Sequence, residues 1–439
     1  MSDAVNGNYS DPNITPPMAQ AIPLGLQHVL AMFASNVTPA IIIAGAAGFA
    51  FGGTEQVYLI QMAMLFAGVA TLFQTVGAGP IGSRLPIMQG TSFAFVSVMT
   101  VIAANAGMAA LMGAIVIAGI FHFCLGAVIG KIRFLFPPLV TGLVILTIGL
   151  YLIPVGVKYA AGGAADFQMA ADSFGSLKHW APALVVIIVS LLVKFYTKGM
   201  ISASAILIGL VAGYLVALAE GLVSFSAVGG ASWVALPELF PFGFEFNIGA
   251  VIAVGLVAIV SAIETVGDTS ATTQGGAGRE ATDKEIAGAT YADGLGSAVA
   301  GVFGGLPNTS FSQNAGIVAM TGVMSRHVVT ISALILIACG LIPKVGALIA
   351  TMPLPVLGGG VIVMFGMVVA AGLNMLSAVE MTRRNMIIIA VSLSVGLGLN
   401  LVPTAVQHVP GTLNTLLVSG LLPTAILAIV LNLVLPKDV

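Results

Sequence analysis

Apolar stretches long enough to cross a lipid bilayer follow one another through almost the whole of this chain. A helix needs about 20 apolar residues to cross roughly 30 Å of hydrocarbon. Charged residues make up only 7% of the sequence, whereas a soluble domain carries about a quarter. Because so few charges cannot cover a water-facing surface, the sequence predicts an all-α integral membrane protein embedded in a lipid bilayer.

The apolar windows, and the loop residues between them, predict 14 transmembrane segments. The third and tenth segments make the poorest helices, because Pro86, Gly90, Pro307 and the polar stretch 308–314 interrupt them. The approximate bounds of the segments are 21–48, 56–77, 85–104, 108–130, 135–157, 179–197, 201–222, 248–271, 285–304, 306–322, 327–350, 354–374, 383–402 and 411–435.

The basic residues support this count and give the chain an orientation. With a cytoplasmic N-terminus, eleven of the 14 Lys and Arg residues fall inside, and Lys158, Lys178 and Lys344 fall outside. Cytoplasmic loops of membrane proteins are enriched in positive charge. We therefore expect both termini in the cytoplasm and the chain in the plasma membrane, which in bacteria is the inner membrane. Residues 1–20 are expected to form a disordered cytoplasmic tail.

Two internal matches at nearly one spacing predict a duplication. Thr91-Ser92-Phe93 returns 218 residues later as Thr309-Ser310-Phe311, and the stretch 136–150 resembles 353–367 with Pro138 against Pro355. The first match alone is also explained by chance. Seven segments per copy is an odd number, so the copies insert with opposite orientation, as in many secondary transporters. The predicted parts are a first repeat (21–222), an external linker (223–247) and a second repeat (248–435).

The interrupted third and tenth segments predict a binding site at the middle of the membrane. Non-helical backbone at membrane depth survives only where protein or a water-filled cavity satisfies it. We expect a short extended piece in each segment, followed by a half-helix that begins near Ser92 or Gln313. Half-helix N-termini present free N–H groups and the positive end of the helix dipole. Polar side chains, including Ser92 and Ser312, are expected to line the space between them.

Three acidic residues fall inside predicted segments: Glu264, Asp268 and Asp293. An ionisable group at membrane depth costs roughly 3 kcal/mol, which makes each a functional candidate. Glu264 and Asp268 are four residues apart and share a helix face, an arrangement that suits a proton-coupled site. Alternatively, Glu264 caps a half-helix, and Asp268 and Asp293 are internal hydrogen-bond partners.

Three further side chains are candidates with a structural alternative. His28, with Gln27 beside it, is either a core residue bonded to a polar neighbour or part of a proton path. Phe93 either stacks on a planar ligand or packs within the protein.

The stretch QNAGIVAMTG at 313–322 resembles the signature of the nucleobase–ascorbate transporter family, Q/E-N-x-G-x4-T-x. It matches at every defined position, including Gly316 and Thr321. Supporting marks are Gln27-His28, Gln89 with Ser92-Phe93, Glu264 with Asp268, and Asp293-Gly294. The resemblance covers about residues 20–435.

This resemblance implies an architecture and residue roles. Segments 1–4 and 8–11 would form a core that carries the substrate, and segments 5–7 and 12–14 a gate. Members are commonly homodimers through the gate and move the core like an elevator. Glu264, Gln313 and Phe93 would bind substrate, and Asn314 would support the site. Asp268 and Asp293 would be essential for transport, and His28 would influence affinity.

The implied function is proton-coupled uptake of a purine nucleobase, with xanthine and/or uric acid favoured. The uracil branch of the family tends to carry Glu at the position of Gln313 and His at that of Asp268; the small Ser92 leaves room for urate. Uracil, another nucleobase and sodium coupling remain alternatives, as does an anion exchanger of the same inverted plan. A channel fits the composition less well than a carrier, because interrupted helices occur in both halves. No metalloprotease or nucleophile-elbow motif indicates an enzyme, and no metal, cofactor or nucleic-acid partner is expected.

Overall fold

Long apolar helices make up most of the structure, a computed structural model that describes residues 10–436 except 164–165, 168 and 170. Within the described residues, eight helices are long and apolar enough to cross a membrane, or nine if the pair α15 and α16, bent by 81°, is one span. The eight are α1 (Met18–Ala46), α2 (Thr54–Thr75), α4 (Gly107–Leu125), α6 (Pro138–Ala160), α8 (Leu177–Tyr196), α12 (Ile248–Ala277), α17 (Leu354–Ser377) and α18 (Arg383–Leu401).

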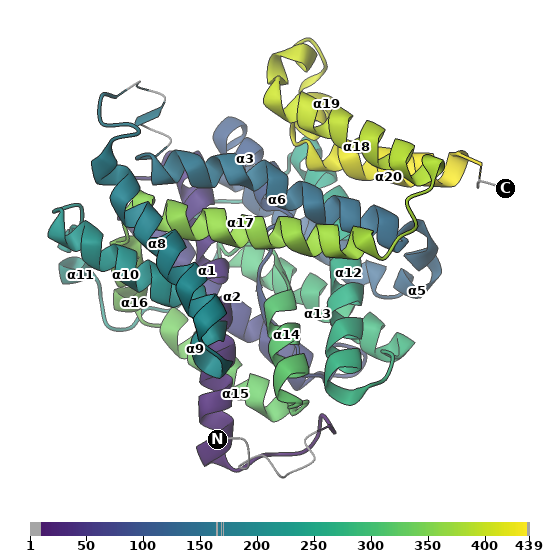
Figure 1. The fold of residues 1–439 in the computed structure, drawn as a ribbon, viewed down its shortest axis with the longest axis horizontal. Coiled ribbons are helices and arrows are strands. Elements are labelled where there is room, and N and C mark those ends of the chain that lie inside the picture. Colours follow the sequence, from purple (N-terminus) through teal and green to yellow (C-terminus); the bar gives the residue numbers. More distant parts are fainter. Residues whose placement is uncertain (1–9, 164–165, 168, 170, 437–439) are drawn as a thin grey trace.

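Further helices complete the bundle in Figure 1. They are α3 (Val96–Asn105), α10 (Ala205–Ala219), α13 (Asp283–Val302), α14 (Ser312–Thr321), α15 (Arg326–Gly340), α16 (Pro343–Ala350), α19 (Gly411–Val418) and α20 (Leu421–Val434), with the one-turn pieces α5 (Ile129–Ile132), α9 (Gly199–Ala203) and α11 (Ser226–Gly230). Each of the 14 predicted segments overlaps at least one helix. The helical membrane class is therefore confirmed, while the count of 14 crossings stays a prediction.

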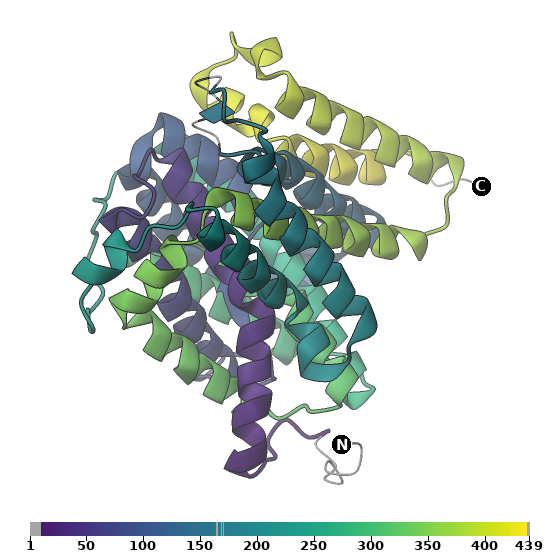
Figure 2. The same cartoon turned by 60° about the vertical axis from the view of Figure 1, so that its left-hand side comes forward.

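Helix packing follows the internal repeat. Helix α4 packs on α13, and the corresponding helix of the other half, α15, packs on α2. In the same way α8 packs on α10 and α18 packs on α20, while α6 packs directly on its own counterpart α17. Figure 2 shows α18 and α20 as a separate layer on the side of the bundle where the chain ends.

Two short strands pair at the centre of the bundle, one from each half. β1 (Gln89–Thr91) and β2 (Asn308–Ser310) run antiparallel, with Gly90 opposite Thr309. The Ser92 N–H donates to the Pro307 carbonyl (2.9 Å), which extends the ladder by one bond. The expected extended pieces in the third and tenth segments are thus confirmed.

Side chains from neighbouring helices satisfy the strand N–H groups that the partner strand leaves free. Asn36 accepts from the Thr91 N–H (2.8 Å), and Thr71 from the Gln89 N–H (2.9 Å). On the other strand, Ser297 accepts from the Asn308 N–H (2.9 Å). Such pairing is what allows non-helical backbone to lie inside a membrane protein.

Two expectations about segment bounds need correction. The half-helix after β1 begins at Val96 and not near Ser92, because a turn closed by the Val96 N–H on the Phe93 carbonyl (3.1 Å) separates the strand ladder from the helix. Residues 10–20 also do not form the expected disordered tail. The Pro12 carbonyl accepts from the Arg326 N–H (3.0 Å), the Ile14 carbonyl accepts from the Ser325 hydroxyl (2.6 Å), and α1 begins at Met18. Residues 1–9 lie outside the described residues.

Loops define two ends of the bundle. The N-terminal segment, the α12–α13 turn and the α14–α15 loop gather at one end, which we call the N-terminal face (Figure 1). The predicted linker 223–247 crosses the opposite end. There the Phe240 N–H bonds to the Val302 carbonyl (2.8 Å) and the Glu245 N–H to the Ala109 carbonyl (3.0 Å).

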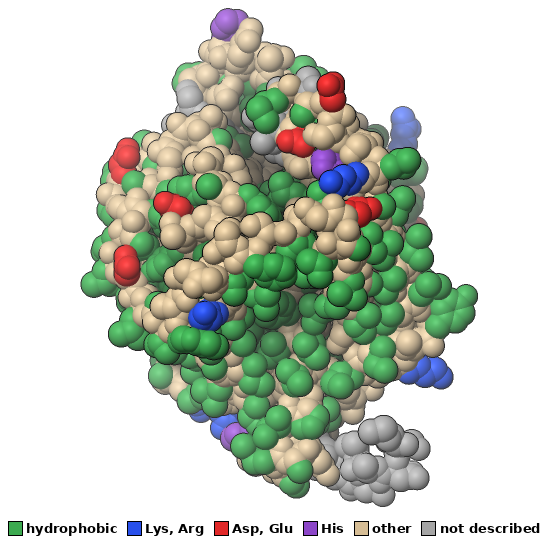
Figure 3. Space-filling view, turned by 90° about the vertical axis from the view of Figure 1, so that its left-hand side faces the viewer, with side chains coloured by type: hydrophobic (Ala, Val, Ile, Leu, Met, Phe, Trp, Pro, Cys, Tyr) green, Lys and Arg blue, Asp and Glu red, His purple; other side chains and the backbone are tan. Residues whose placement is uncertain are grey.

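Hydrophobic side chains form a broad band between these ends on the face that carries α8 and α10, with most charged side chains toward its edges (Figure 3). Exposed members of this band include Leu184, Ile188, Leu191, Val211 and Leu215. Apolar exposure on this scale is expected of a surface that faces lipid.

Candidate functional site

A cavity of about 380 Å³ lies beside the strand pair, where α12 and α14 face α6, α10 and α17. One wall is polar and belongs to α12, β2 and the start of α14. The facing wall is apolar. The polar wall includes Glu264, Asp268, Thr309, Ser310, Ser312 and Gln313, and the apolar wall includes Ile145, Ile148, Ile206, Met364, Met367 and Met375.

Two carboxyl groups on α12 reach this cavity but differ in their partners. Asp268 accepts hydrogen bonds from the Ser310 hydroxyl (2.9 Å) and the Ser312 hydroxyl (2.6 Å). Glu264 lies one turn earlier, and its buried Oε2 atom has no hydrogen-bond partner among the described residues. A buried carboxyl oxygen without a partner is unfavourable, so Glu264 is poised to accept hydrogen bonds from a ligand.

The start of α14 supplies donors to the same space. Ser312 and Gln313 are its first two residues, so their N–H groups have no acceptor within the helix. The positive end of the helix dipole points the same way. The Gln313 side chain is exposed to the cavity and makes no hydrogen bond to a described residue.

An aromatic ring closes the cavity beside β1. Phe93 lines it and meets Phe365 of α17 edge to face, with 5.0 Å between ring centroids. Phe365 is fully buried, so this contact links the strand side of the site to the facing helix.

Asp293 lies behind the strands and does not line the cavity. It is fully buried on α13 and accepts from the Gln89 amide (2.5 Å), the Gln74 amide (3.0 Å) and the Thr265 hydroxyl. These bonds join α13 to β1, α2 and α12. Asp293 therefore holds together the elements that carry the site.

A second buried pair fixes α14 against α1. The Asn314 amide donates to the His28 carbonyl (3.0 Å) and lies 3.0 Å from the His28 Nδ1 atom. Neither residue lines the cavity. Gln27 and Ser92 are also buried away from it, and the Ser92 hydroxyl has no partner among the described residues.

The last two signature residues lie further along α14. Gly316 faces open space, and the Thr321 hydroxyl donates to the Ile317 carbonyl (2.8 Å) one turn back. The structure thus brings Glu264, Asp268, Phe93, Ser312 and Gln313 together at the cavity. It places Ser92, Asn314, Asp293, His28, Gln27 and Gln89 behind its wall.

Several residues of the site were missed in the sequence. Ser310, Thr265, Gln74 and Asn36 each bond to a strand or to an acid, and the available signal was a polar side chain within an apolar stretch. The apolar wall gave no signal, since its residues resemble all other apolar positions. Within the described part of the chain, no cluster of three His, Cys, Asp or Glu residues could hold a metal ion.

Comparison with known proteins decides the family. A family model described as "Permease family" matches residues 19–405. This chain belongs to the nucleobase–ascorbate transporter family. As a member of this family it is a permease and not an enzyme. It is 38% identical to the uric acid permease PucJ of Bacillus subtilis, over 93% of this chain and 91% of that protein. It is 36% identical to the xanthine permease of the same species, over 94% of this chain and 93% of that protein.

Solved structures share the fold of this family member at low sequence identity. The transmembrane domain of the cyanobacterial bicarbonate transporter BicA aligns with a TM-score of 0.62 and 16% identity, covering 95% of this chain and 98% of that one. SLC26A9 aligns with a TM-score of 0.60 and 14% identity, covering 86% and 63%. These matches support the helical membrane architecture alone.

Proposed function

We propose that this permease is a secondary active transporter that takes up a purine nucleobase, xanthine and/or uric acid, together with protons. The observation that carries the proposal is the unpartnered Glu264 carboxyl at a cavity with Gln313 and the N-terminus of α14. The relatives named for uric acid and xanthine support it.

The chemistry of the cavity suits a purine edge. A carboxylate such as Glu264 accepts from two adjacent ring N–H groups, and the Gln313 amide both donates and accepts. The free N–H groups at the start of α14 donate to ring carbonyls. Phe93 offers a face or edge to the flat ring, and a volume of about 380 Å³ falls in the range of small-ligand sites.

Proton coupling rests on Glu264 and Asp268, which share one face of α12 beside the substrate. A proton that moves inward gains about 2.3 kcal/mol per 100 mV of membrane potential. In this proposal both termini are cytoplasmic, so the N-terminal face is the cytoplasmic one. The core, built from segments 1–4 and 8–11, moves like an elevator against the gate of segments 5–7 and 12–14, and two chains pair through their gates. His28 and Asp293 support transport from behind the cavity wall.

Uracil or another nucleobase is the alternative substrate within the same chemistry. An anion exchanger of the same inverted plan is the other alternative, and the charge of the site disfavours it. Among the described residues that line the cavity, two are acidic and none is Lys or Arg.

Uptake of radiolabelled xanthine by cells expressing the chain tests the proposal, with unlabelled urate and uracil as competitors. We expect urate to compete better than uracil, and uptake to follow a pH gradient and not sodium. Glu264→Gln and Gln313→Ala should each lower uptake at least tenfold at equal expression. Glu264→Gln loses a carboxylate that accepts from two ring N–H groups, and Gln313→Ala loses an amide that both donates and accepts. Normal transport by both variants would show that the site lies elsewhere.

A further inference from the structure

A second cavity lies further along α12, toward the N-terminal face. It measures about 340 Å³ and is lined by Ser270, Ala271, Gln274, Glu280 and Ala281. Ala271 lines both cavities, so they are neighbours along α12.

One face of α12 runs along both cavities. Gly267, Ala271, Gln274 and Gly278 are exposed and follow one another at spacings of three or four residues, which places them on one stripe of the helix. A Cβ atom at Gly267 or Gly278 would meet no atom within 4 Å. From Glu264 to Gln274 the helix rises about 15 Å, too far for one purine to touch both. The second cavity is therefore a separate place along an open path.

The second cavity repeats the functional groups of the first. Glu280 offers a carboxylate, Gln274 a carboxamide and Ser270 a hydroxyl. The side chains of Gln274 and Glu280 make no hydrogen bond or ion pair with any described residue, and both are exposed. The Ser270 hydroxyl donates to the Val266 carbonyl (2.8 Å) and keeps its lone pairs free to accept.

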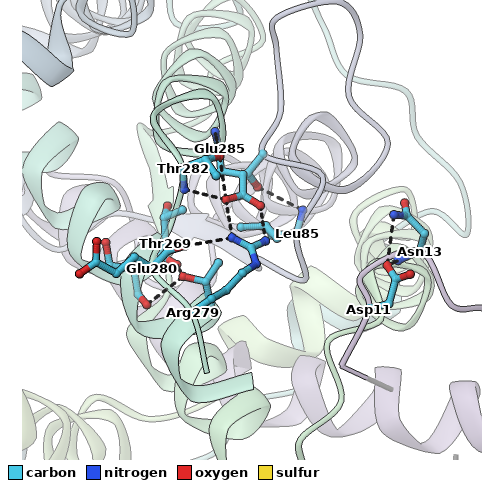
Figure 4. Close-up of polar contacts among 11 residues, drawn as sticks. Asp11, Asn13, Leu85, Thr269, Arg279, Glu280, Thr282 and Glu285 are labelled. Carbon is cyan, nitrogen blue, oxygen red and sulfur yellow. Dashed lines mark hydrogen bonds and ion pairs between the residues drawn. The ribbon is translucent and has the colours of Figure 1, made fainter. Parts of the chain in front are cut away.

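The α12–α13 turn fixes the position of Glu280. Helix α12 ends at Gly278, whose φ of 62° is the left-handed conformation that favours glycine. Arg279 then forms an ion pair with Glu285 (2.5 Å), and Thr282 forms a capping box with Glu285. Figure 4 shows the Glu280 side chain pointing away from this cluster. Because Arg279 is taken up by Glu285, the Glu280 carboxylate is left free to bind a donor.

We propose that Ser270, Gln274 and Glu280 form a second, weaker purine subsite on the release path, which the substrate occupies between the central cavity and the N-terminal face. This inference rests on the proposed function, because it assigns the same substrate to the second cavity. A free carboxylate and a free amide recognise the same N–H and C=O edge that Glu264 and Gln313 recognise.

Transport measured from each side tests the subsite. Xanthine uptake into intact cells presents substrate to one face, and uptake into inside-out membrane vesicles presents it to the other. For Glu280→Gln and Gln274→Ala we expect KM at the N-terminal face to rise at least fivefold, while KM at the opposite face changes less than twofold. Asp283→Asn is the matched control, because Asp283 is a nearby exposed carboxylate that lines a different hollow beside Lys131.

A second measurement does not depend on turnover. Ala281→Cys, in a chain with Cys124 and Cys339 replaced by Ser, reports on the second cavity through its rate of maleimide labelling. Xanthine should slow this labelling even when Glu264→Gln disables the central site, and adding Glu280→Gln should remove the effect.

If Glu280→Gln and Gln274→Ala behave like Asp283→Asn in both measurements while the parent chain transports xanthine, the subsite is wrong and the proposed function stands. If the parent chain neither binds nor transports a purine, both fail.

Discussion

Glu264 on α12 and Asp293 on α13 differ in their hydrogen-bond partners. Asp293 receives hydrogen bonds from three side chains and does not line the central cavity, whereas one Glu264 oxygen has no partner among the described residues and its side chain lines that cavity. A residue whose bonds are all internal stabilises the fold. One that keeps an oxygen free at a cavity is available to substrate or a proton.

Truncating each acid should separate these roles. Asp293→Ala leaves the buried amide of Gln89 without its acceptor, which costs about 1–3 kcal/mol and lowers Tm. Glu264→Ala removes no acceptor from any donor among the described residues, so Tm should stay close to that of the parent while uptake is lost. Thermal unfolding in detergent, followed by size-exclusion chromatography, measures the Tm of both variants, and the uptake assay measures their transport. Equal Tm values for the two variants would contradict the structural role of Asp293.

Conservative replacement sharpens the comparison. In Asp293→Asn the amide oxygen still accepts from Gln89 and Gln74. Its NH2 group faces the Thr265 hydroxyl, which can turn its single hydrogen from Asp293 to the Ser261 carbonyl (3.1 Å) and then accept from the new amide. We expect Asp293→Asn to recover most of the Tm that Asp293→Ala loses.

At the residue scale the sequence predicted the acids well, because a charge within an apolar stretch stands out. It did not predict their partners. Gln74, Thr265 and Ser310 come from three different elements, and which polar side chains meet is decided by how those elements pack. The same limit explains why Ser92 was expected to line the site and lies behind the wall.

The strand pair is packed tightly against α1 and against the residues that follow it. A Cβ atom at Gly90 would lie 2.7 Å from Met32 Cε and from Phe311 Cζ, and 2.9 Å from the Asn36 oxygen that accepts from Thr91. Gly90 therefore allows the strand to pass close to α1 and to the opposite strand. The sequence signalled this crossing through its prolines, glycines and polar run.

Gly90→Ala should accordingly destabilise the fold. Met32 and Phe311 must shift and the Asn36–Thr91 bond must lengthen, an overpacking that costs about 1–3 kcal/mol. The control is Gly366→Ala on α17, where a Cβ atom meets nothing within 4 Å and alanine favours the helix. We expect Tm to fall for Gly90→Ala and to hold or rise for Gly366→Ala; a Tm for Gly90→Ala at the parent value would show that the strands tolerate the extra methyl.

Helix starts were harder to predict than strands. Ser92 is a favoured N-cap residue, and the apolar run after it indicated a helix there. The structure uses the Ser92 N–H in the strand ladder instead, and a turn over 93–95 delays α3 until Val96. After β2 the Phe311 N–H joins the ladder in the same way, to the Met88 carbonyl (3.0 Å), but no turn intervenes and α14 begins at Ser312, one residue from the expected position.

For the whole molecule, hydrophobic length and the internal repeat were enough to predict the class of fold and the meeting of the two interrupted segments. They could not predict the apolar wall of the site. Met367 and Met375 on α17 face the cavity, but one apolar residue in an apolar helix looks like another in the sequence. The direction in which the cavity opens also depends on packing alone.

That direction leads to a prediction about the state of the whole carrier. Away from the N-terminal face the Phe93–Phe365 contact and Ser35 against Met364 (3.3 Å) lie beside the site, whereas Ala271 lines both the site and the second cavity. With the N-terminal face in the cytoplasm, Ala271→Cys in a chain lacking Cys124 and Cys339 should react with an impermeant maleimide in inside-out vesicles and not in intact cells. Xanthine should slow the reaction severalfold, because it must occupy or cross that point.

Ala253→Cys, fully buried on the same helix, should react from neither side and is the control. Labelling of Ala271→Cys from the outside alone would reverse the orientation of the chain, and equal labelling from both sides would argue against a closed far end.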